Sequence, residues 1–193
     1  MHRLYVSEGI VLKKSPVGEA NTLVSILSEE FGLVRAKATS TRAESSKLRY
    51  GLESLTLARF SFVAGRYEWK LTGVESVSHE LFASSIQKRV AAGRITKLLL
   101  RLIHGEEEGR ALFGTVKQGL TLLAKATSTQ ETGSIECILV LRVLSHLGYL
   151  PQTEALKAFV EGDFESSELA LMANTSRSFL IRTINESLMQ TGL

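Results

Sequence analysis

The hydrophobic periodicity of the chain changes near residue 78, and this change limits the possible folds more than any other feature. Residues 1–78 contain short apolar and β-branched runs separated by turn residues, which is typical of strands. Beyond that point apolar residues recur at helical i, i+3, i+4 and i+7 spacing, as over residues 95–102. We therefore expect an α+β protein with a β domain over residues 1–78, a helical domain over 79–193 and a boundary within 77–81.

Five strands are predicted in the first part, over residues 4–13, 22–28, 33–39, 55–63 and 67–77. A tight hairpin at residues 29–32 joins the second strand to the third, with Gly32 able to take a positive φ. Because full closure removes the unpaired edges of a small sheet, these strands suit a closed barrel. A five-stranded oligonucleotide/oligosaccharide-binding (OB) fold is the leading candidate, and an SH3-like barrel remains open on pattern alone.

Helices are expected around residues 95–102, 112–123 and 135–147, then in shorter pieces near 152–160 and 166–173, and finally over 176–190. The helix over 135–147 is apolar nearly all round and is followed by Gly148 and Pro151, which are typical of a helix end. We expect this helix to lie at the centre of a bundle.

The net charge of +3 comes from 23 Lys and Arg against 20 Asp and Glu, and the whole excess lies in residues 1–78. Much of it falls in one strand and the polar loop that follows, where Glu44 is the only acid among five cations: Arg35, Lys37, Arg42, Lys47 and Arg49. A localised basic stripe rich in neighbouring hydroxyls suits a nucleic-acid phosphate backbone. A merely solvated loop is the competing interpretation.

Strand alternation places Arg35 and Lys37 on one face of the predicted third strand, opposite to its small apolar residues. Trp69, in the fifth strand, is a candidate for stacking on bases. Its alternative role is to fill the barrel core.

The sequence carries no enzyme constellation. Its four histidines lack metal-ligand spacing, and there is no glycine-rich phosphate loop. The single cysteine, Cys137, excludes an internal disulfide and a multi-cysteine zinc site, and in an apolar helix it is expected to be a core residue. We expect no catalytic residue, metal or cofactor, no membrane span, and a reducing cytoplasmic setting near the nucleoid.

Arg142 interrupts the apolar helix between Leu141 and Val143. A charge there needs a partner or a route to the surface. The favoured interpretation is an intramolecular ion pair, and the alternative is a cation at the edge of a groove that binds an acidic, apolar peptide.

The chain resembles the RecO family of bacterial recombination mediators in four segments that occur in the family's order. They are EGIVLKKSPVGEANTLVSILSEEFGLVRAKA over residues 8–38, SKLRYGLESL over 46–55, LRVLSHLGYLP over 141–151 and RSFLIRTINESL over 177–188. The resemblance implies an OB barrel followed by a helical domain. It also implies a non-enzymatic activity: binding single- and double-stranded DNA, annealing complementary strands coated with single-strand-binding protein (SSB), and helping RecR to load RecA.

By position, Arg35, Lys37, Lys47 and Arg49 match the family's basic strand and loop, and Arg142 matches the region implied to bind the SSB tail. Many members carry a four-cysteine zinc module where this chain reads QTEALKAFVEGDF, over residues 152–164, so no zinc is expected. The family's A-K-G-A-R-R is replaced by AKATSTR, which thins the adjacent cations. A generic OB module for single-stranded DNA or RNA, and a protein-interaction scaffold, remain the alternative functions.

Overall fold

The computed structural model describes residues 3–39, 48–65, 68–81, 85–103, 105 and 109–190. The chain divides into two compact units, one formed by Met1–Phe82 with His104–Phe113 and the other by Ala83–Ile103 with Gly114–Leu193. The domain boundary that we place after residue 78 stays a prediction. Each unit is described by itself.

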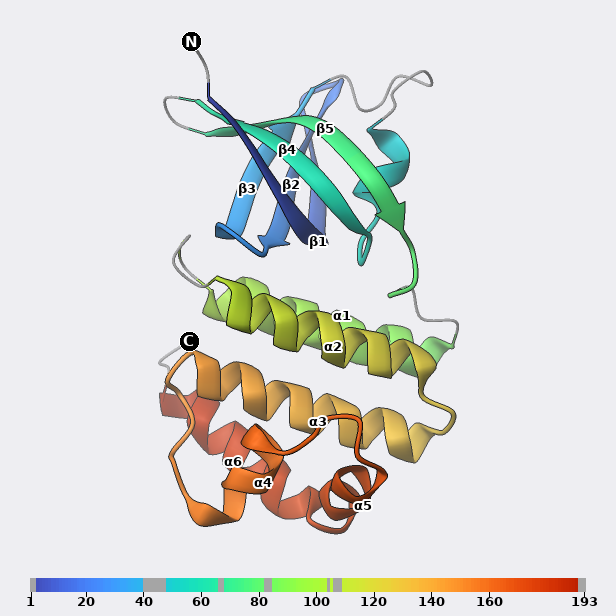
Figure 1. Ribbon diagram of the computed structural model, residues 1–193, viewed down its shortest axis with the longest axis vertical. Helices are drawn as coiled ribbons and strands as arrows, with labels where there is room; N and C mark the ends of the chain where they lie inside the picture. The colour runs from blue at the N-terminus through green and yellow to red at the C-terminus, as the bar shows by residue number, and fades with distance from the viewer. Residues whose placement is uncertain are drawn as a thin grey trace. The chain divides into compact units, whose positions relative to one another are not determined.

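The first unit is a closed barrel of five strands: β1 (Leu4–Val17), β2 (Asn21–Ser28), β3 (Gly32–Ala38), β4 (Leu57–Ala64) and β5 (Trp69–Ser78) (Figure 1). The strands follow the order β1-β2-β3-β5-β4, and β4 closes the barrel by pairing with β1. Among these strands only the β3–β5 pair is parallel. The predicted five-stranded OB-type barrel followed by helices, and with it the α+β class, is confirmed.

The barrel is filled by the inward residues of every strand, including Val24, Val34, Phe60 and Phe62, which are fully buried. In β3 the alternation is as predicted, with Val34, Ala36 and Ala38 inward. The hairpin between β2 and β3 also forms where it was expected, with φ of 59° at Gly32.

Strand β1 is longer than predicted. The turn-forming residues after residue 13 suggested an early end, yet the strand continues through Pro16 and the turn falls at Gly18, whose φ is 61°. A register shift between Val11 and Lys13 bends β1, so that its first half pairs with β4 and its second half with β2. One curved strand thereby serves two sides of the barrel.

A one-turn 3-10 helix, η1 (Arg49–Leu52), packs against the barrel before β4 begins. Leu52 is buried in the barrel core, and Leu48 packs against the same cluster. A side chain at Gly51 would overlap the Val74 side chain of β5, so only glycine allows this close approach.

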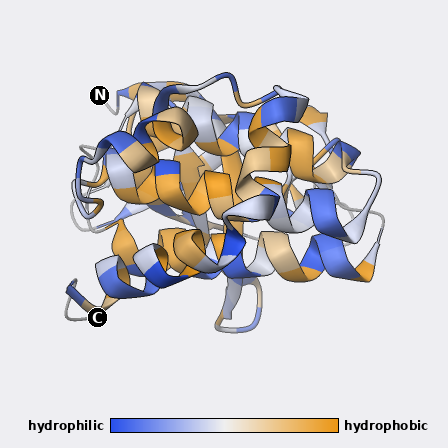
Figure 2. Ribbon diagram, turned by 90° about the horizontal axis from the view of Figure 1, so that it is seen from below, coloured by the Kyte–Doolittle hydropathy of each residue, from blue (hydrophilic) through white to orange (hydrophobic). Residues whose placement is uncertain are grey.

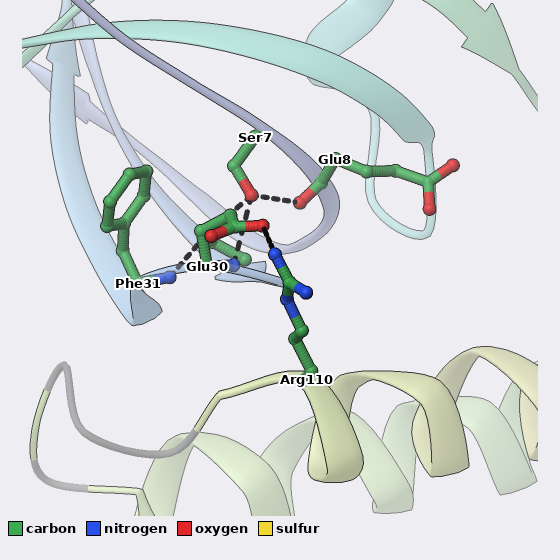
Figure 3. Close-up of polar contacts among 6 residues, drawn as sticks. Ser7, Glu8, Glu30, Phe31 and Arg110 are labelled. Atoms are coloured by element: carbon green, nitrogen blue, oxygen red, sulfur yellow. Dashed lines mark hydrogen bonds and ion pairs between the residues drawn. The ribbon is translucent and has the colours of Figure 1, made fainter.

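The barrel unit also includes His104–Phe113, and two described residues of this segment, Gly105 and Arg110, contact the β2–β3 hairpin (Figure 3). The guanidinium of Arg110 forms an ion pair with the Glu30 carboxylate, and the Leu33 N–H donates to the Gly105 carbonyl at 3.4 Å. On the side of Glu30 away from Arg110, the buried Ser7 hydroxyl accepts from the Glu30 N–H at 3.1 Å and donates to the Glu8 carbonyl at 2.9 Å (Figure 3). The hairpin is therefore held from two sides.

The second unit is helical and contains α1 (Ile86–Leu102), α2 (Arg110–Lys125, of which the first turn belongs to the barrel unit), α3 (Thr129–His146), α4 (Glu154–Glu161), α5 (Ser167–Thr175) and α6 (Arg177–Gln190). Hydrophilic and hydrophobic residues are interspersed along these helices, as expected for helices that pack one face against their neighbours (Figure 2). Three of them begin at serine caps: Ser85, Ser128 and Ser166.

Helix α3 contacts α1, α4, α5 and α6, which confirms its predicted central place. It begins at Thr129, earlier than its apolar run, because Ser128 accepts a hydrogen bond from the Glu131 N–H at 3.1 Å. Its end is marked by a positive φ of 74° at Gly148, as expected.

Candidate nucleic-acid interface

The outer face of β3 displays the first two predicted cations. Arg35 is exposed and Lys37 is partly exposed, while their neighbours along the strand point into the core. The Lys37 ammonium lies 3.8 Å from the Glu68 carboxylate, and both side chains remain accessible to water. Such an exposed pair is weak and leaves Lys37 able to bind another anion.

The strand register extends this pair into a larger basic surface. Ser25 of β2 lies opposite Arg35 on one side and opposite Lys13 of β1 on the other. In the parallel β3–β5 pair, Lys70 lies directly opposite Lys37. Residues opposite one another share a face of the sheet. We call Lys13, Arg35, Lys37 and Lys70 the barrel cation row.

The four cations of the barrel cation row are close enough for their electrostatic potentials to overlap. Neighbouring strands lie about 4.8 Å apart, and residues i and i+2 along a strand about 6.7 Å apart. Lys37 lies one such step from Arg35 and one from Lys70, which is less than the Debye length of about 8 Å at physiological salt. Lys13 lies two strand spacings, about 9.6 Å, from Arg35, which is close to that length, so its potential adds to theirs more weakly. Like charges facing each other, as at Lys37 and Lys70, are unfavourable until an anion binds.

Another part of the barrel's outer surface is not cationic. On β1, β4 and β5 the register places Glu8, Arg59 and Glu75 side by side, so two carboxylates flank one guanidinium. The cationic surface therefore centres on β3, with Lys13 of β1 and Lys70 of β5 on its two sides.

Sequence reasoning missed Lys13 and Lys70. Both belong to strands that were predicted, and each alternates with inward residues. Only the pairing register shows that they join Arg35 and Lys37, and the bulge in β1 decides which face Lys13 takes.

The predicted loop cations are less well defined. Arg42 and Lys47 lie outside the described residues, and Arg49 is placed only as the first residue of η1. Their assignment to nucleic-acid binding stays a prediction.

Trp69 is half-buried and packs with three aromatic rings of the barrel. Its ring centroid lies 5.1 Å from that of Tyr5, 5.9 Å from Phe31 and 6.1 Å from Phe62. These contacts fit the alternative role given to Trp69 from the sequence, which is to fill the barrel core. Only part of the indole remains accessible for stacking on a base.

Arg142 makes its contacts inside the helical unit. Its Nε donates to the Phe159 carbonyl at 2.9 Å and its terminal nitrogen donates to the Gly162 carbonyl at 2.5 Å. The guanidinium carbon also lies 4.4 Å from the centroid of the Phe164 ring. Burial lowers the pKa of Arg142, and the nearby Asp163 carboxylate opposes that shift.

Among the described residues, no group of three or more His, Cys, Asp or Glu could hold a metal ion. Burial raises the pKa of the Cys137 thiol, which keeps it protonated and weakly nucleophilic. Within the same described ranges, none of the helices has both the length and the apolarity to span a bilayer.

The sequence of the barrel that displays this basic surface matches a known domain family. Residues 1–79 match the family model described as recombination protein O, N terminal. The barrel resembles the N-terminal domain of RecO proteins. Relatives named DNA repair protein RecO match it at 29% identity over 153 residues in Gloeothece citriformis and at 31% over 153 residues in Heliobacterium modesticaldum.

The match to RecO proteins extends beyond the barrel. These two alignments cover 79% and 78% of the chain, so they enter the helical unit, but only 54% of each relative. A RecO protein of Acaryochloris marina is 31% identical over 159 residues, with 80% of the chain and 53% of the relative covered. The chain spans about half the length of these RecO relatives.

Proposed function

We propose that this chain is a DNA repair and recombination protein of the RecO family that binds single- and double-stranded DNA through its barrel. The observation that carries the proposal is the barrel cation row, which gathers four cations from three strands on one outer face. Contacts to phosphates dominate the affinity of proteins for DNA and require no base sequence.

The same surface gives a physical route to strand annealing. Two DNA strands repel each other through their phosphates, and cations between them offset that repulsion until bases pair. We propose that the chain anneals SSB-coated complementary strands and, with RecR, assists the loading of RecA. This role needs binding and positioning rather than a catalytic residue, and it belongs with the nucleoid in the cytoplasm.

We further propose that the helical unit binds the acidic, apolar C-terminal tail of SSB. Both hydrogen bonds of Arg142 are directed to carbonyls of its own chain. These contacts favour a supporting role, in which Arg142 holds α4 and the turn after it in place for the tail.

The binding proposal is tested by removing the charge of the row. In the test variant Lys13, Arg35, Lys37 and Lys70 become glutamine. In the control variant four exposed cations of α1, α2 and α6 become glutamine: Lys97, Arg101, Lys125 and Arg182. Both variants lose the same net charge, so a difference between them reports position.

Affinity for a labelled single strand and for a duplex is then measured against salt concentration. Four phosphate contacts predict a log–log slope of roughly −3 for the parent protein on single strands. We expect the row variant to lose most of this slope and the control to keep it. Equal losses in both variants would contradict the assignment of the barrel surface.

Annealing of SSB-coated complementary strands separates the recombination mediator from a generic OB-fold module for single-stranded DNA or RNA. The mediator accelerates annealing in the presence of SSB, whereas a plain binding module does not. A protein-interaction scaffold, in contrast, would bind neither the labelled single strand nor the duplex, even at low salt.

A further inference from the structure

Helix α1 carries five cations and no acidic residue, and its charge is only partly neutralised within the helical unit. Arg94 is paired with Glu136 of α3 through two hydrogen bonds of 2.6 Å. Lys97 and Arg101, in contrast, are exposed. The C-terminal half of α1 therefore presents a positive surface with no acid of its own helix to balance it.

The two exposed cations share one side of α1 with two exposed apolar residues. Successive spacings of four, seven and four residues place the members of this group along a single stripe of the helix: Ile86, Val90, Lys97 and Arg101. Ile86 is 68% exposed, and the buried residues of α1 lie on the opposite side of the helix. We call these four residues the α1 outer stripe. Its N-terminal half is apolar and its C-terminal half is cationic.

The exposed side of α5 has the complementary composition. Glu168, Leu171 and Met172 stand at i, i+3 and i+4, so they lie on one side of this helix, and Leu171 is 64% exposed. Glu165, also exposed, comes just before the helix. We call these four residues the α5 outer face. Its acidic residues lie towards the N-terminus and its apolar residues towards the C-terminus.

The two surfaces match when an α5 helix lies antiparallel along an α1 helix. Apolar side chains then cover apolar side chains, and carboxylates lie beside the cations. Antiparallel packing also brings together helix ends of opposite partial charge. The surfaces of one molecule cannot meet each other, because α1 and α5 both pack on α3 and turn these sides to solvent.

We propose that the α1 outer stripe binds the α5 outer face of a second copy of this chain, so that the protein associates head to tail. Charge complementarity selects this occupant, since one chain carries both a cationic and an acidic surface with apolar residues in the matching place. A contact between two different surfaces can repeat from copy to copy. Each added copy brings one more barrel, which makes contact with a long ligand multivalent.

Sedimentation velocity of the DNA-free protein tests the association. The surfaces are small, so we expect weak binding, with a sedimentation coefficient that rises over roughly 10–500 µM protein at low salt and is constant at roughly 0.5 M salt. Reversal of the stripe by Lys97→Glu with Arg101→Glu should lower the association constant at least about tenfold, because like charges then face each other. Reversal of the α5 outer face by Glu165→Lys with Glu168→Lys should do the same.

A variant with all four changes exchanges the charges of the two surfaces and should associate within about threefold of the parent, since every cation again faces an acid. The control Lys125→Glu with Arg182→Glu alters net charge as much as the stripe reversal does, but on α2 and α6, and should leave association within about threefold of the parent.

A parent that stays monomeric at low salt would overturn the inference, and so would equal losses in the control and the stripe reversal. Failure of the four-change variant to recover would also overturn it. A loss on reversing the stripe but not the α5 outer face would assign the stripe to a different acidic partner and contradict the second-copy proposal. Because these measurements contain no DNA, their outcome is independent of the proposed DNA binding.

Discussion

Arg142 is partly buried, and its guanidinium is bound by groups of its own chain. Its two nitrogens bond the Phe159 and Gly162 carbonyls at the C-terminal end of α4, where a helix presents unpaired acceptors. The ring of Phe164 covers the guanidinium face. The sequence favoured an intramolecular ion pair, whereas the contacts of Arg142 in the structure are hydrogen bonds to two carbonyl groups and the ring of Phe164.

Replacing Arg142 should therefore lower the stability of the helical unit. We expect Arg142→Met to reduce the free energy of unfolding by about 2–3 kcal/mol, because two acceptors lose charged donors. Arg142→Lys keeps the charge without the planar fork and should lose less, about 1–2 kcal/mol. Urea unfolding measures both losses.

The exposed Arg182 of α6 supplies the matching control. Arg182→Met should stay within about 0.5 kcal/mol of the parent. An Arg142→Met protein as stable as this control would show that the α4 contacts contribute nothing.

Glu131 links stability to pH at the start of α3. The Thr127 N–H and hydroxyl both donate to its carboxylate, at 2.7 and 2.8 Å, and these bonds hold the pKa of Glu131 below its ordinary value. The stability that they provide is therefore complete above the unfolded pKa and is lost as the pH falls through the folded pKa.

We expect the Glu131→Gln variant to lose less stability than the parent between about pH 5 and pH 3, since the carboxylate that protonates is gone. Urea midpoints measured across that range test the expectation. Glu186→Gln, an exposed change on α6, controls for the loss of one negative charge. Parallel curves for the parent and Glu131→Gln would rule out the proposed linkage.

At the scale of the element, helix α2 contains two glycines with opposite surroundings. A side chain at Gly119 would place its Cβ 2.6 Å from both terminal methyls of Leu139, which is fully buried in α3, whereas Gly114 has open space around it. Alanine favours a helix over glycine by about 1 kcal/mol. Crowding against a core side chain costs about 1–3 kcal/mol.

Gly114→Ala should consequently raise the free energy of unfolding by about 0.5–1 kcal/mol. Gly119→Ala should be less stable than Gly114→Ala by about 1–3 kcal/mol. Because both changes share one helix and one chemistry, thermal or urea unfolding of the pair isolates the α2–α3 packing. Equal stabilities would mean that Leu139 repacks freely.

Strand existence was easier to predict than strand extent. The alternation in β3 and the Gly32 hairpin follow from local backbone geometry, so the sequence was sufficient for both. The continuation of β1 through Pro16 depends on pairing with β2, which no local pattern encodes.

For the whole molecule, the absence of a cysteine cluster leads to a simple expectation. The sequence has one cysteine, and the described residues contain no group suited to a metal ion. We expect purified protein to contain no stoichiometric zinc, and its melting temperature to be unchanged by a chelator, since metal-linked folding requires ligands. One equivalent of bound zinc by elemental analysis would contradict this.

The net charge, its distribution along the chain and the likeness to RecO could all be predicted from the sequence. The composition of the basic surface was not. Two of its four members, Lys13 and Lys70, lie far in sequence from Arg35 and Lys37 and join them only across paired strands. Trp69 could be placed in the core or on the surface by pattern alone, and its three ring contacts required the closed barrel.

The sequence alone determined the alternation of each strand, the amphipathic helices, the single cysteine and the excess of positive charge before residue 78, because these are local or additive properties. Only the tertiary structure decided which cations share a face, that Trp69 is packed, and which carbonyls Arg142 binds. Those outcomes depend on register, on the β1 bulge and on contacts between residues distant in sequence, and long-range pairing is what folding adds to the chain.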